Sequence, residues 1–379
     1  MSASAPGARG AVAVRQARAC EDCLRRGPLL AELSSQLDYC WRDRERLIEL
    51  LALGDEDLVR AVAGRRKQEL KARLEDLGQA QVGGLPHLEN LERFCRHDRS
   101  YPRALSGRAD PRLLYVAGGV RRLGELAAGP VVAIVGSRRA SDYGMAMAKS
   151  LARGLNASAV TIVAGISDGI AVAAHHGSLE AGGRTVAVLP GGLGLGAPAK
   201  RRALLERIRQ HGCALAELPC DCPPRRWGAL ASERIVAGMA NVTVVVEAEE
   251  DSRELACARI AQDRGRTVAA MPGRVTSPFS QGTHALLVEG APLVRGTEDV
   301  LELLHPVGCS PHRAGQEQAR LEPRLQAVLA RVGAGEDTAE QLLREGEDAG
   351  ELLLALSELE LRGLLVRGDA GRYVPRDAL

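Results

Sequence analysis

Two glycine-containing turns carry the residues best suited to chemistry. The run Gly136-Ser137-Arg138-Arg139 follows the apolar segment Val131–Val135, and a second turn, Gly165–Gly169, follows Val160–Ala164. Backbone N–H groups in such a turn bind anions, because the helix that follows adds partial positive charge. The guanidinium of Arg138 could hold a phosphate through two parallel hydrogen bonds. The pattern indicates a phosphate-binding pocket, and a tight turn beside a solvated arginine is the alternative interpretation.

Apolar segments that alternate with helical patterns must position these turns. The segment Val131–Val135 is short and apolar, with four β-branched residues among five, which is typical of a buried parallel strand. Further strands are expected at 160–164, 185–189, 214–217, 242–247 and 267–270, and helices at 145–155, 170–181, 202–210, 232–239, 255–264, 282–290 and 298–304. This order predicts an α/β fold with a Rossmann-like, doubly wound, mainly parallel sheet, and it places both turns at the carboxyl ends of strands.

A third glycine-rich loop and a basic run are expected at the same edge of the predicted sheet. The glycine-rich segment Pro190–Gly196 follows the strand expected at 185–189. The run Lys200-Arg201-Arg202 then stands at the start of a predicted helix, where positive charge opposes the helix dipole. A bound anion would give a reason for these cations.

Two adjacent histidines, His175 and His176, lie on the helix after the second turn and could act in acid–base chemistry or as ligands. Glu180 follows one helical turn after His176, but no third ligand is near in sequence. We therefore interpret the two histidines as structural.

A CxxC pair, Cys20 and Cys23, raises the possibility of a metal site. Cys40, Cys95 and His97 could complete a zinc site with it. Because the pair stands alone in the sequence, buried or idle thiols are the favoured interpretation, and we assign no metal ligands.

Composition limits the classes of partner. The net charge is only +2, with +4 in residues 111–310 and −4 in residues 311–379, so no strong overall field attracts nucleic acid. Aromatic residues make up 2% of the chain, which argues against a base-stacking platform. We expect a cytoplasmic protein with free thiols, because no signal peptide or membrane span is evident and the nine cysteines are an odd count.

We expect four parts in the chain. Residues 1–93 form a helical domain with the first ~15 residues disordered, and residues 94–305 form the α/β core, which opens with a connector containing a short strand at 113–116. Residues 306–315 are a linker rich in Pro, Ser and Gly. Residues 316–379 show three helical patterns and a hairpin with its turn at 369–371, which is typical of a winged helix. Its negative charge favours contact with protein over contact with DNA.

The sequence resembles the bacterial DNA-processing protein A family (DprA, also called Smf). The resemblance rests on runs that follow the family's order between 94 and 304, including FCRHDRSYPRAL, VAIVGSRRASDYG, AGISDGIA, VAVLPGG, ERIVAG, VTVVVEA, GRTVAAMPGRVTSP and GTHALLVEGAPLV. It implies a Rossmann-like core that binds single-stranded DNA, forms a homodimer and hands strands to the RecA recombinase during natural transformation. It implies no catalysis, no cofactor and no membrane association.

The resemblance and the charge pattern together define a set of candidate DNA-contacting residues. Gly136, Ser137 and Arg138 match the family's phosphate-contacting GSR turn, and Gly165 and Gly169 match its second glycine turn. Arg234 matches the last arginine of the family's FPxRNR motif. The expected contacts are Gly136, Ser137, Arg138, Arg139, Gly165, Gly169, Lys200, Arg201, Arg202 and Arg234.

The sequence also departs from the family pattern on the surface expected to meet DNA. The segment Ala229–Arg234 lacks one arginine of FPxRNR and gains Glu233, Ala171 replaces the family's aspartate, and Asp168 stands at a position that is often basic or neutral. The loop Leu193–Pro198 lacks the family's Asp and Tyr, and Ser252-Arg253 replaces its SG. Each lost phosphate contact weakens the salt-dependent part of DNA binding.

Two other functions fit parts of the sequence. A divergent paralogue could act as a protein-interaction scaffold without DNA binding, as the altered motifs and acidic tail suggest. A nucleotide-cleaving phosphoribohydrolase would explain Pro190-Gly191-Gly192, but the Gly-Thr and the glutamate pair that should follow are missing.

Overall fold

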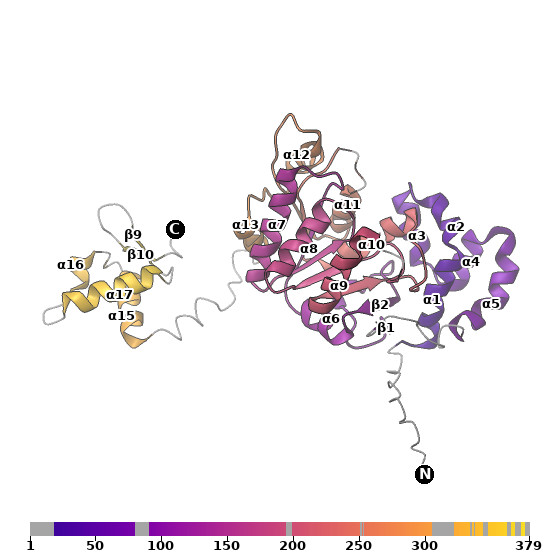
Figure 1. The fold of residues 1–379 in the computed structure, drawn as a ribbon, viewed down its shortest axis with the longest axis horizontal. Coiled ribbons are helices and arrows are strands. Elements are labelled where there is room, and N and C mark those ends of the chain that lie inside the picture. Colours follow the sequence, from indigo (N-terminus) through magenta and orange to yellow (C-terminus); the bar gives the residue numbers. More distant parts are fainter. Residues whose placement is uncertain are drawn as a thin grey trace, which may run out of the picture. The chain divides into compact units, whose positions relative to one another are not determined.

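The computed structural model describes residues 19–79, 91–194, 199–250, 252, 254–304, 322–333, 336, 338–343, 348–361, 365–367 and 373–375. The chain divides into two compact units, Met1–Leu304 and His305–Leu379. The expected N-terminal domain and α/β core share the first unit (Figure 1). The segments expected to be disordered (the first ~15 residues) and to act as a linker (306–315) lie outside the described residues.

An eight-stranded sheet forms the centre of the first unit, with the order β1-β2-β6-β5-β4-β3-β7-β8. The strands from β6 to β8 run parallel, and β1 and β2 are antiparallel additions at one edge. The strands are β1 (Leu91–Cys95), β2 (Leu113–Ala117), β3 (Val131–Val135), β4 (Thr161–Gly165), β5 (Thr185–Val188), β6 (Cys213–Ala216), β7 (Val242–Val245) and β8 (Thr267–Ala270). The predicted α/β class and mainly parallel sheet are confirmed.

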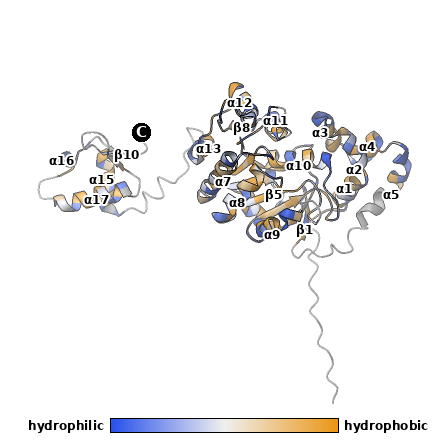
Figure 2. Cartoon of the chain, turned by 45° about the horizontal axis from the view of Figure 1, so that its top comes forward, coloured by the Kyte–Doolittle hydropathy of each residue, from blue (hydrophilic) through white to orange (hydrophobic). Residues whose placement is uncertain are grey.

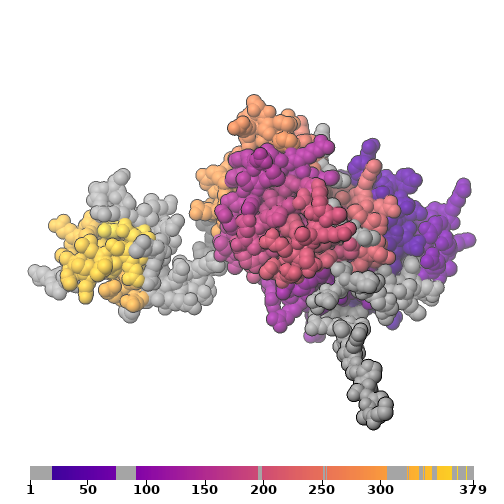
Figure 3. Space-filling model, in the orientation of Figure 1, coloured from indigo at the N-terminus to yellow at the C-terminus, as the bar shows by residue number. Residues whose placement is uncertain are grey.

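Helices cover both faces of the sheet and are joined to it by short connections. The helices of this unit are α1 (Glu21–Glu32), α2 (Ser34–Leu37), α3 (Arg44–Ala52), α4 (Asp55–Val62), α5 (Lys67–Gln79), α6 (Val120–Ala127), α7 (Asp142–Ala157), α8 (Ile170–Glu180), α9 (Arg202–His211), α10 (Arg226–Met239), α11 (Leu255–Asp263), α12 (Gln281–Val288) and α13 (Thr297–Leu304). Helices α7, α8 and α9 build one continuous face of the unit (Figure 3).

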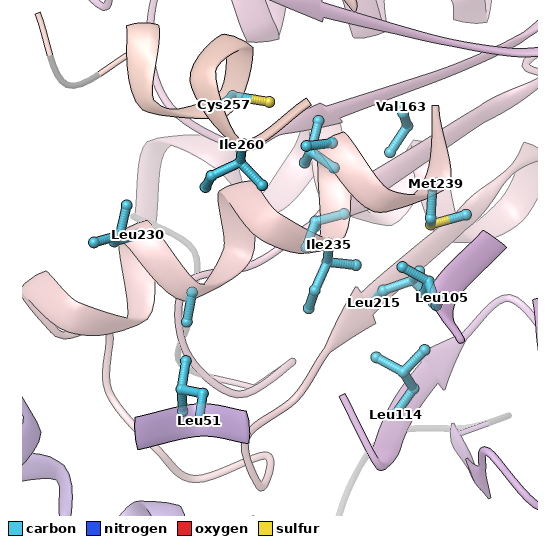
Figure 4. Packing of buried hydrophobic residues seen from close by; sticks show 14 of the residues in the cluster. Leu51, Leu105, Leu114, Val163, Leu215, Leu230, Ile235, Met239, Cys257 and Ile260 are labelled. Carbon is cyan, nitrogen blue, oxygen red and sulfur yellow. The ribbon is translucent and has the colours of Figure 1, made fainter. Parts of the chain in front are cut away.

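Alternation along the strands sorts the core into two layers. Val132 and Ile134 of β3 pack with α7 and α8, whereas Ala133 and Val135 point to the opposite layer with α10 and α11. This is the pattern of side chains expected for a sheet buried on both faces. Figure 2 shows hydrophobic residues concentrated in the strands, and Figure 4 shows Leu230, Ile235 and Met239 of α10 within the second layer.

The N-terminal helices pack directly on this second layer. Leucines of α1, α3 and α4 share one core cluster with β2 and α10. The strand predicted at 113–116 is confirmed as β2, but the sequence analysis missed β1, and both strands belong to the sheet. Strand β1 pairs antiparallel with β2, and β2 pairs antiparallel with β6.

The second unit contains helices and a hairpin. Its described elements are α15 (Pro323–Gly333), α16 (Ala339–Leu342), α17 (Ala349–Leu361), β9 (Leu365–Arg367) and β10 (Tyr373–Pro375). The two strands pair antiparallel, and Leu325, Leu356 and Tyr373 share a small core. Within the described residues of both units, no helix is long and apolar enough to cross a membrane.

Candidate nucleic-acid interface

A pocket opens at the carboxyl ends of β3, β4 and β5, and we call it the edge pocket. Six of its lining residues are Gly136, Arg138, Gly165, Ser167, Pro190 and Glu233. The first five come from the three loops that the sequence places at strand ends, and Glu233 comes from α10. Open α/β sheets bind ligands at this edge, near the point where the strand order reverses. Here the reversal lies at β3, which has β4 on one side and β7 on the other.

The two glycine turns interlock beneath the edge pocket. Gly169 has a φ of +74°, and a Cβ there would collide with the carbonyl oxygen of Ser137. A Cβ on Gly136 would lie 2.6 Å from the carbonyl oxygen of Glu247. The backbone N–H of Ile170 donates to the carbonyl oxygen of Ser137 over 3.2 Å. The turns therefore form one rigid element, in which glycine is required for close backbone approach.

A carboxylate of the chain already occupies the start of α7. Glu247, which is 4% exposed, accepts hydrogen bonds from the backbone N–H of Ser141 (2.9 Å) and from its hydroxyl (2.6 Å). The Ser141 hydroxyl in turn accepts from the backbone N–H of Gly144 over 3.1 Å. An internal carboxylate therefore lies at this end of α7 and disfavours a phosphate there. Sequence reasoning missed Glu247; its only signal is an acidic residue directly after the apolar run 242–246.

The start of α8 differs, because no carboxylate of the described residues accepts a hydrogen bond from its N–H groups. In the part of the chain that the structure describes, the backbone N–H groups of Ser167, Asp168 and Ala171 donate no hydrogen bond. Ser167 and Ala171 both line the edge pocket. A helix start with unpaired N–H groups and a favourable dipole is an anion site. Of the two turns expected to bind phosphate, the one at the start of α8 is therefore the better candidate.

Arg138 and Arg139 extend from the first turn into solvent. Both are exposed, and Arg138 lines the edge pocket. Neither guanidinium forms an ion pair or hydrogen bond with any residue that the structure describes. Ser137 is buried and uses its hydroxyl to accept from the backbone N–H of Arg139 over 3.1 Å. The two arginines are therefore available to an external anion, while Ser137 shapes the turn.

The basic run after the third loop is partly neutralised by Asp168. The Lys200 ammonium lies 2.5 Å from one carboxylate oxygen of Asp168, and Arg201 Nε donates to the other over 2.9 Å. Hydrogen bonds from Lys200 and Arg201 lower the pKa of Asp168 below its usual value. Arg202, at the first position of α9, is exposed. This corner therefore carries less free positive charge than its sequence suggests.

Arg234 lies elsewhere than the sequence led us to expect. Its side chain is 1% exposed, and it donates to both carboxylate oxygens of Glu217 over 2.6 Å each. A buried guanidinium that already makes two hydrogen bonds to a carboxylate is not accessible to a DNA phosphate. The structure therefore contradicts the expected direct contact and assigns Arg234 to the attachment of α10 to the segment after β6. The neighbouring Glu233 lines the edge pocket together with Glu254, and both carboxylates disfavour an anion in its interior.

The two histidines have structural surroundings, as the sequence analysis favoured. His175 is fully buried, and its ring nitrogens lie 2.8 Å from Thr185 Oγ1 and 2.9 Å from the carbonyl oxygen of Gly165. Burial lowers the pKa of His175 to about 4. Burial also lowers the pKa of His176, and Glu180 pairs with Lys149 over 2.7 Å. His175 therefore holds α8 on the sheet through these two contacts.

These features define an α/β protein whose mainly parallel sheet has glycine turns at its carboxyl edge, where an anion site is a candidate. The sequence model of the family described as DNA recombination-mediator protein A matches residues 92–305. The chain belongs to this family, whose members are named DprA or Smf, and the resemblance inferred from the motifs is confirmed.

Relatives support the same assignment over most of the chain. A putative DNA processing protein DprA of Mycobacterium tuberculosis is 38% identical over 274 residues, covering 69% of this chain and 70% of the relative. Protein Smf of Escherichia coli is 33% identical over 281 residues, covering 72% and 74% respectively.

Two solved structures share the fold. DprA from Streptococcus pneumoniae aligns with a TM-score of 0.59 at 29% identity, covering 74% of this chain and 95% of that one. DprA from Helicobacter pylori aligns with a TM-score of 0.50 at 26% identity, covering 57% and 96%. The second structure is described as showing a unique mode of single-stranded DNA binding.

Proposed function

We propose that this protein binds single-stranded DNA through backbone phosphates at the edge pocket and passes the strand to the RecA recombinase. The observation that carries the proposal is the start of α8, where unpaired N–H groups lie beside the exposed Arg138. Arg139 and Arg202 supply further accessible charge. The interlocked Gly136 and Gly169, with Gly165 at the end of β4, keep the backbone close to the bound strand. Arg234 acts only through the fold.

Phosphate contacts predict binding with little sequence preference. Aromatic residues make up 2% of the chain, so base stacking contributes little. Affinity for single-stranded DNA should fall with salt, with a slope of about −0.7 for each phosphate neutralised.

The test replaces Arg138 by alanine and measures binding of a labelled single-stranded oligonucleotide by fluorescence anisotropy at several salt concentrations. We expect about tenfold weaker binding at low salt and a salt slope smaller by about 0.7, because one charge-assisted phosphate contact is lost. Arg121→Ala is the matched control. Its side chain is 90% exposed on α6. Helix α6 follows β2, and the end of β2 pairs with the start of β6. Arg121 therefore lies away from the carboxyl edge of the sheet.

Two results would contradict the proposal. Equal losses in Arg138→Ala and Arg121→Ala would show that only overall charge matters. Absence of binding by the unaltered protein, even at low salt, would exclude DNA binding by this chain.

We further propose a cytoplasmic, non-catalytic homodimer formed through the Rossmann-like core. The second unit is proposed to be a winged helix that contacts protein, on the basis of its helices α15–α17, its hairpin β9–β10 and the −4 charge of residues 311–379. Light scattering of the full chain and of a variant lacking residues 305–379 would test the dimer, and both should form it.

A scaffold without DNA binding is the second candidate function. The ion pairs of Asp168 with Lys200 and Arg201 favour it, because they reduce the accessible charge at the site. It predicts a normal dimer with no retention of single-stranded DNA at low salt.

A further inference from the structure

Four side chains of ligand type meet at the boundary between the N-terminal helices and the sheet. Cys20 and Cys23 come from the start of α1, and Cys95 and His97 come from the end of β1 and the turn after it. Their candidate ligand atoms all lie within 4.8 Å of one another. These residues are distant in sequence, so the fold itself brings them together.

The distances between these atoms match a tetrahedral metal site. His97 Nδ1 lies 3.3 Å from Cys20 Sγ, 3.6 Å from Cys23 Sγ and 3.8 Å from Cys95 Sγ. Cys95 Sγ and Cys20 Sγ are 3.9 Å apart. Zinc binds thiolate sulfur at about 2.3 Å and imidazole nitrogen at about 2.0–2.1 Å, which separates tetrahedral ligands by roughly 3.5–3.8 Å. One ion at the centre could therefore reach all four atoms with small shifts.

The backbone presents the ligands from two rigid supports. Cys20 is the extended residue before α1 and Cys23 lies in its first turn, so both thiols face the same side of the helix start. Cys95 ends β1, and the bond from the Asp98 N–H to the Cys95 carbonyl (2.9 Å) forms the turn that returns His97 toward the thiols. Cys23 and Cys95 are buried, whereas Cys20 and His97 are exposed, which gives an ion access from solvent.

The ligand set separates a metal site from a disulfide. The three cysteines are not in disulfides, and a disulfide would use two thiols and leave the imidazole without a role. Three sulfur ligands and one nitrogen form the Cys₃His set of structural zinc sites. Four protein ligands leave no open position for substrate. Cys40, considered in the sequence analysis as a further ligand, does not belong to this group.

We propose that Cys20, Cys23, Cys95 and His97 bind one structural zinc ion that fastens α1 to β1. The ion joins the N-terminal helices to the edge of the sheet. It has no direct part in DNA binding, so this proposal stands independently of the proposed function.

The test measures metal bound to the full-length protein, purified under reducing conditions without a chelator. We expect one zinc ion per chain by elemental analysis and native mass spectrometry. Cys20→Ser and His97→Ala alter exposed residues, so the fold should persist while zinc content falls at least fivefold. Cys40→Ser is the matched control, because it removes a free thiol outside the group and should retain the zinc.

Two further measurements use the same variants. Cobalt(II) added to the metal-free protein should give the visible absorption of a tetrahedral thiolate complex, which Cys20→Ser should weaken and Cys40→Ser should keep. A chelator should lower the melting temperature of the unaltered protein by several degrees, with little change in His97→Ala. The proposal is overturned if the unaltered protein takes up neither zinc nor cobalt, if Cys40→Ser loses metal as readily as Cys20→Ser, or if Cys20 and Cys23 form a disulfide under these conditions.

Discussion

At the scale of single residues, burial separates the charges that build the fold from those available to a partner. Arg234 and Arg138 are both arginines near the edge pocket. Arg234 is buried in an ion pair with Glu217, whereas Arg138 is exposed and lines the pocket. Removing one member of a buried pair leaves an uncompensated charge and destabilises the protein, whereas an exposed arginine can be removed with little effect on stability. The same residue type thus has two different roles within one site.

His175 predicts a pH dependence of stability. Its pKa is about 4 in the folded state and about 6.5 when unfolded, so the unfolded chain binds more protons between these values. The stabilisation is therefore complete above pH 6.5 and is lost as the pH falls toward 4, to a total of about 3 kcal/mol. Urea unfolding at pH 7.5, 6.0 and 5.0 should show this loss, and His175→Gln should show a shallower dependence on pH. Identical pH slopes in the two proteins would contradict this assignment.

At the scale of elements, the two glycine turns behave as one unit. Gly169→Ala should lower the free energy of unfolding by about 2 kcal/mol and weaken DNA binding, because φ is +74° and the new methyl group would meet the Ser137 carbonyl. Urea denaturation measures the first effect, and anisotropy measures the second.

Gly165→Ala is the control for stability in that experiment. No atom lies within 4 Å of the place where its Cβ would be, so the free energy of unfolding should change by less than about 0.5 kcal/mol. Equal destabilisation by both substitutions would show that the interlocking of the turns has no special importance.

The parallel part of the sheet was predictable because short apolar segments alternate regularly with helical patterns along the chain. The strand at Val131–Val135 has the expected bounds because its five apolar residues are buried on both faces. Strand β1 was missed because LERFC is mixed in character and depends on pairing with β2. Helix α10 begins at Arg226, six residues before the predicted start. Its first turn buries Trp227, whose backbone N–H donates to Asp38 over 3.1 Å.

The site was predictable in position but not in its charge balance. The glycine turns and Arg138 could be found from local pattern, because a strand followed by a glycine turn and a helix has few structural solutions. The carboxylates that modify the site come from other segments. Glu247 reaches Ser141 across 106 positions, and Asp168 reaches Lys200 across 32. No local spacing rule connects such pairs, so only the folded chain shows them.

At the scale of the whole molecule, the chain consists of two compact units with separate cores. A variant ending at residue 304 should therefore keep the melting temperature of the first unit within about 2 °C, since that unit has a hydrophobic core of its own. Differential scanning calorimetry of the full chain should resolve a second, smaller transition that this variant lacks. A large fall in the melting temperature of the truncated protein would show that the first unit depends on the second.

The carboxylate of Asp168 occupies the place where a DNA phosphate would meet Lys200 and Arg201. Under the proposed function, DNA binding at this corner is therefore an exchange, in which an anion of the protein gives way to an anion of the nucleic acid. If the carboxylate stays nearby, the two cations neutralise about one phosphate instead of two, and they add about 0.7 rather than about 1.4 to the salt slope. A surface of this kind would hold a strand less firmly than its arginine content suggests, which suits the proposed role of giving the strand away.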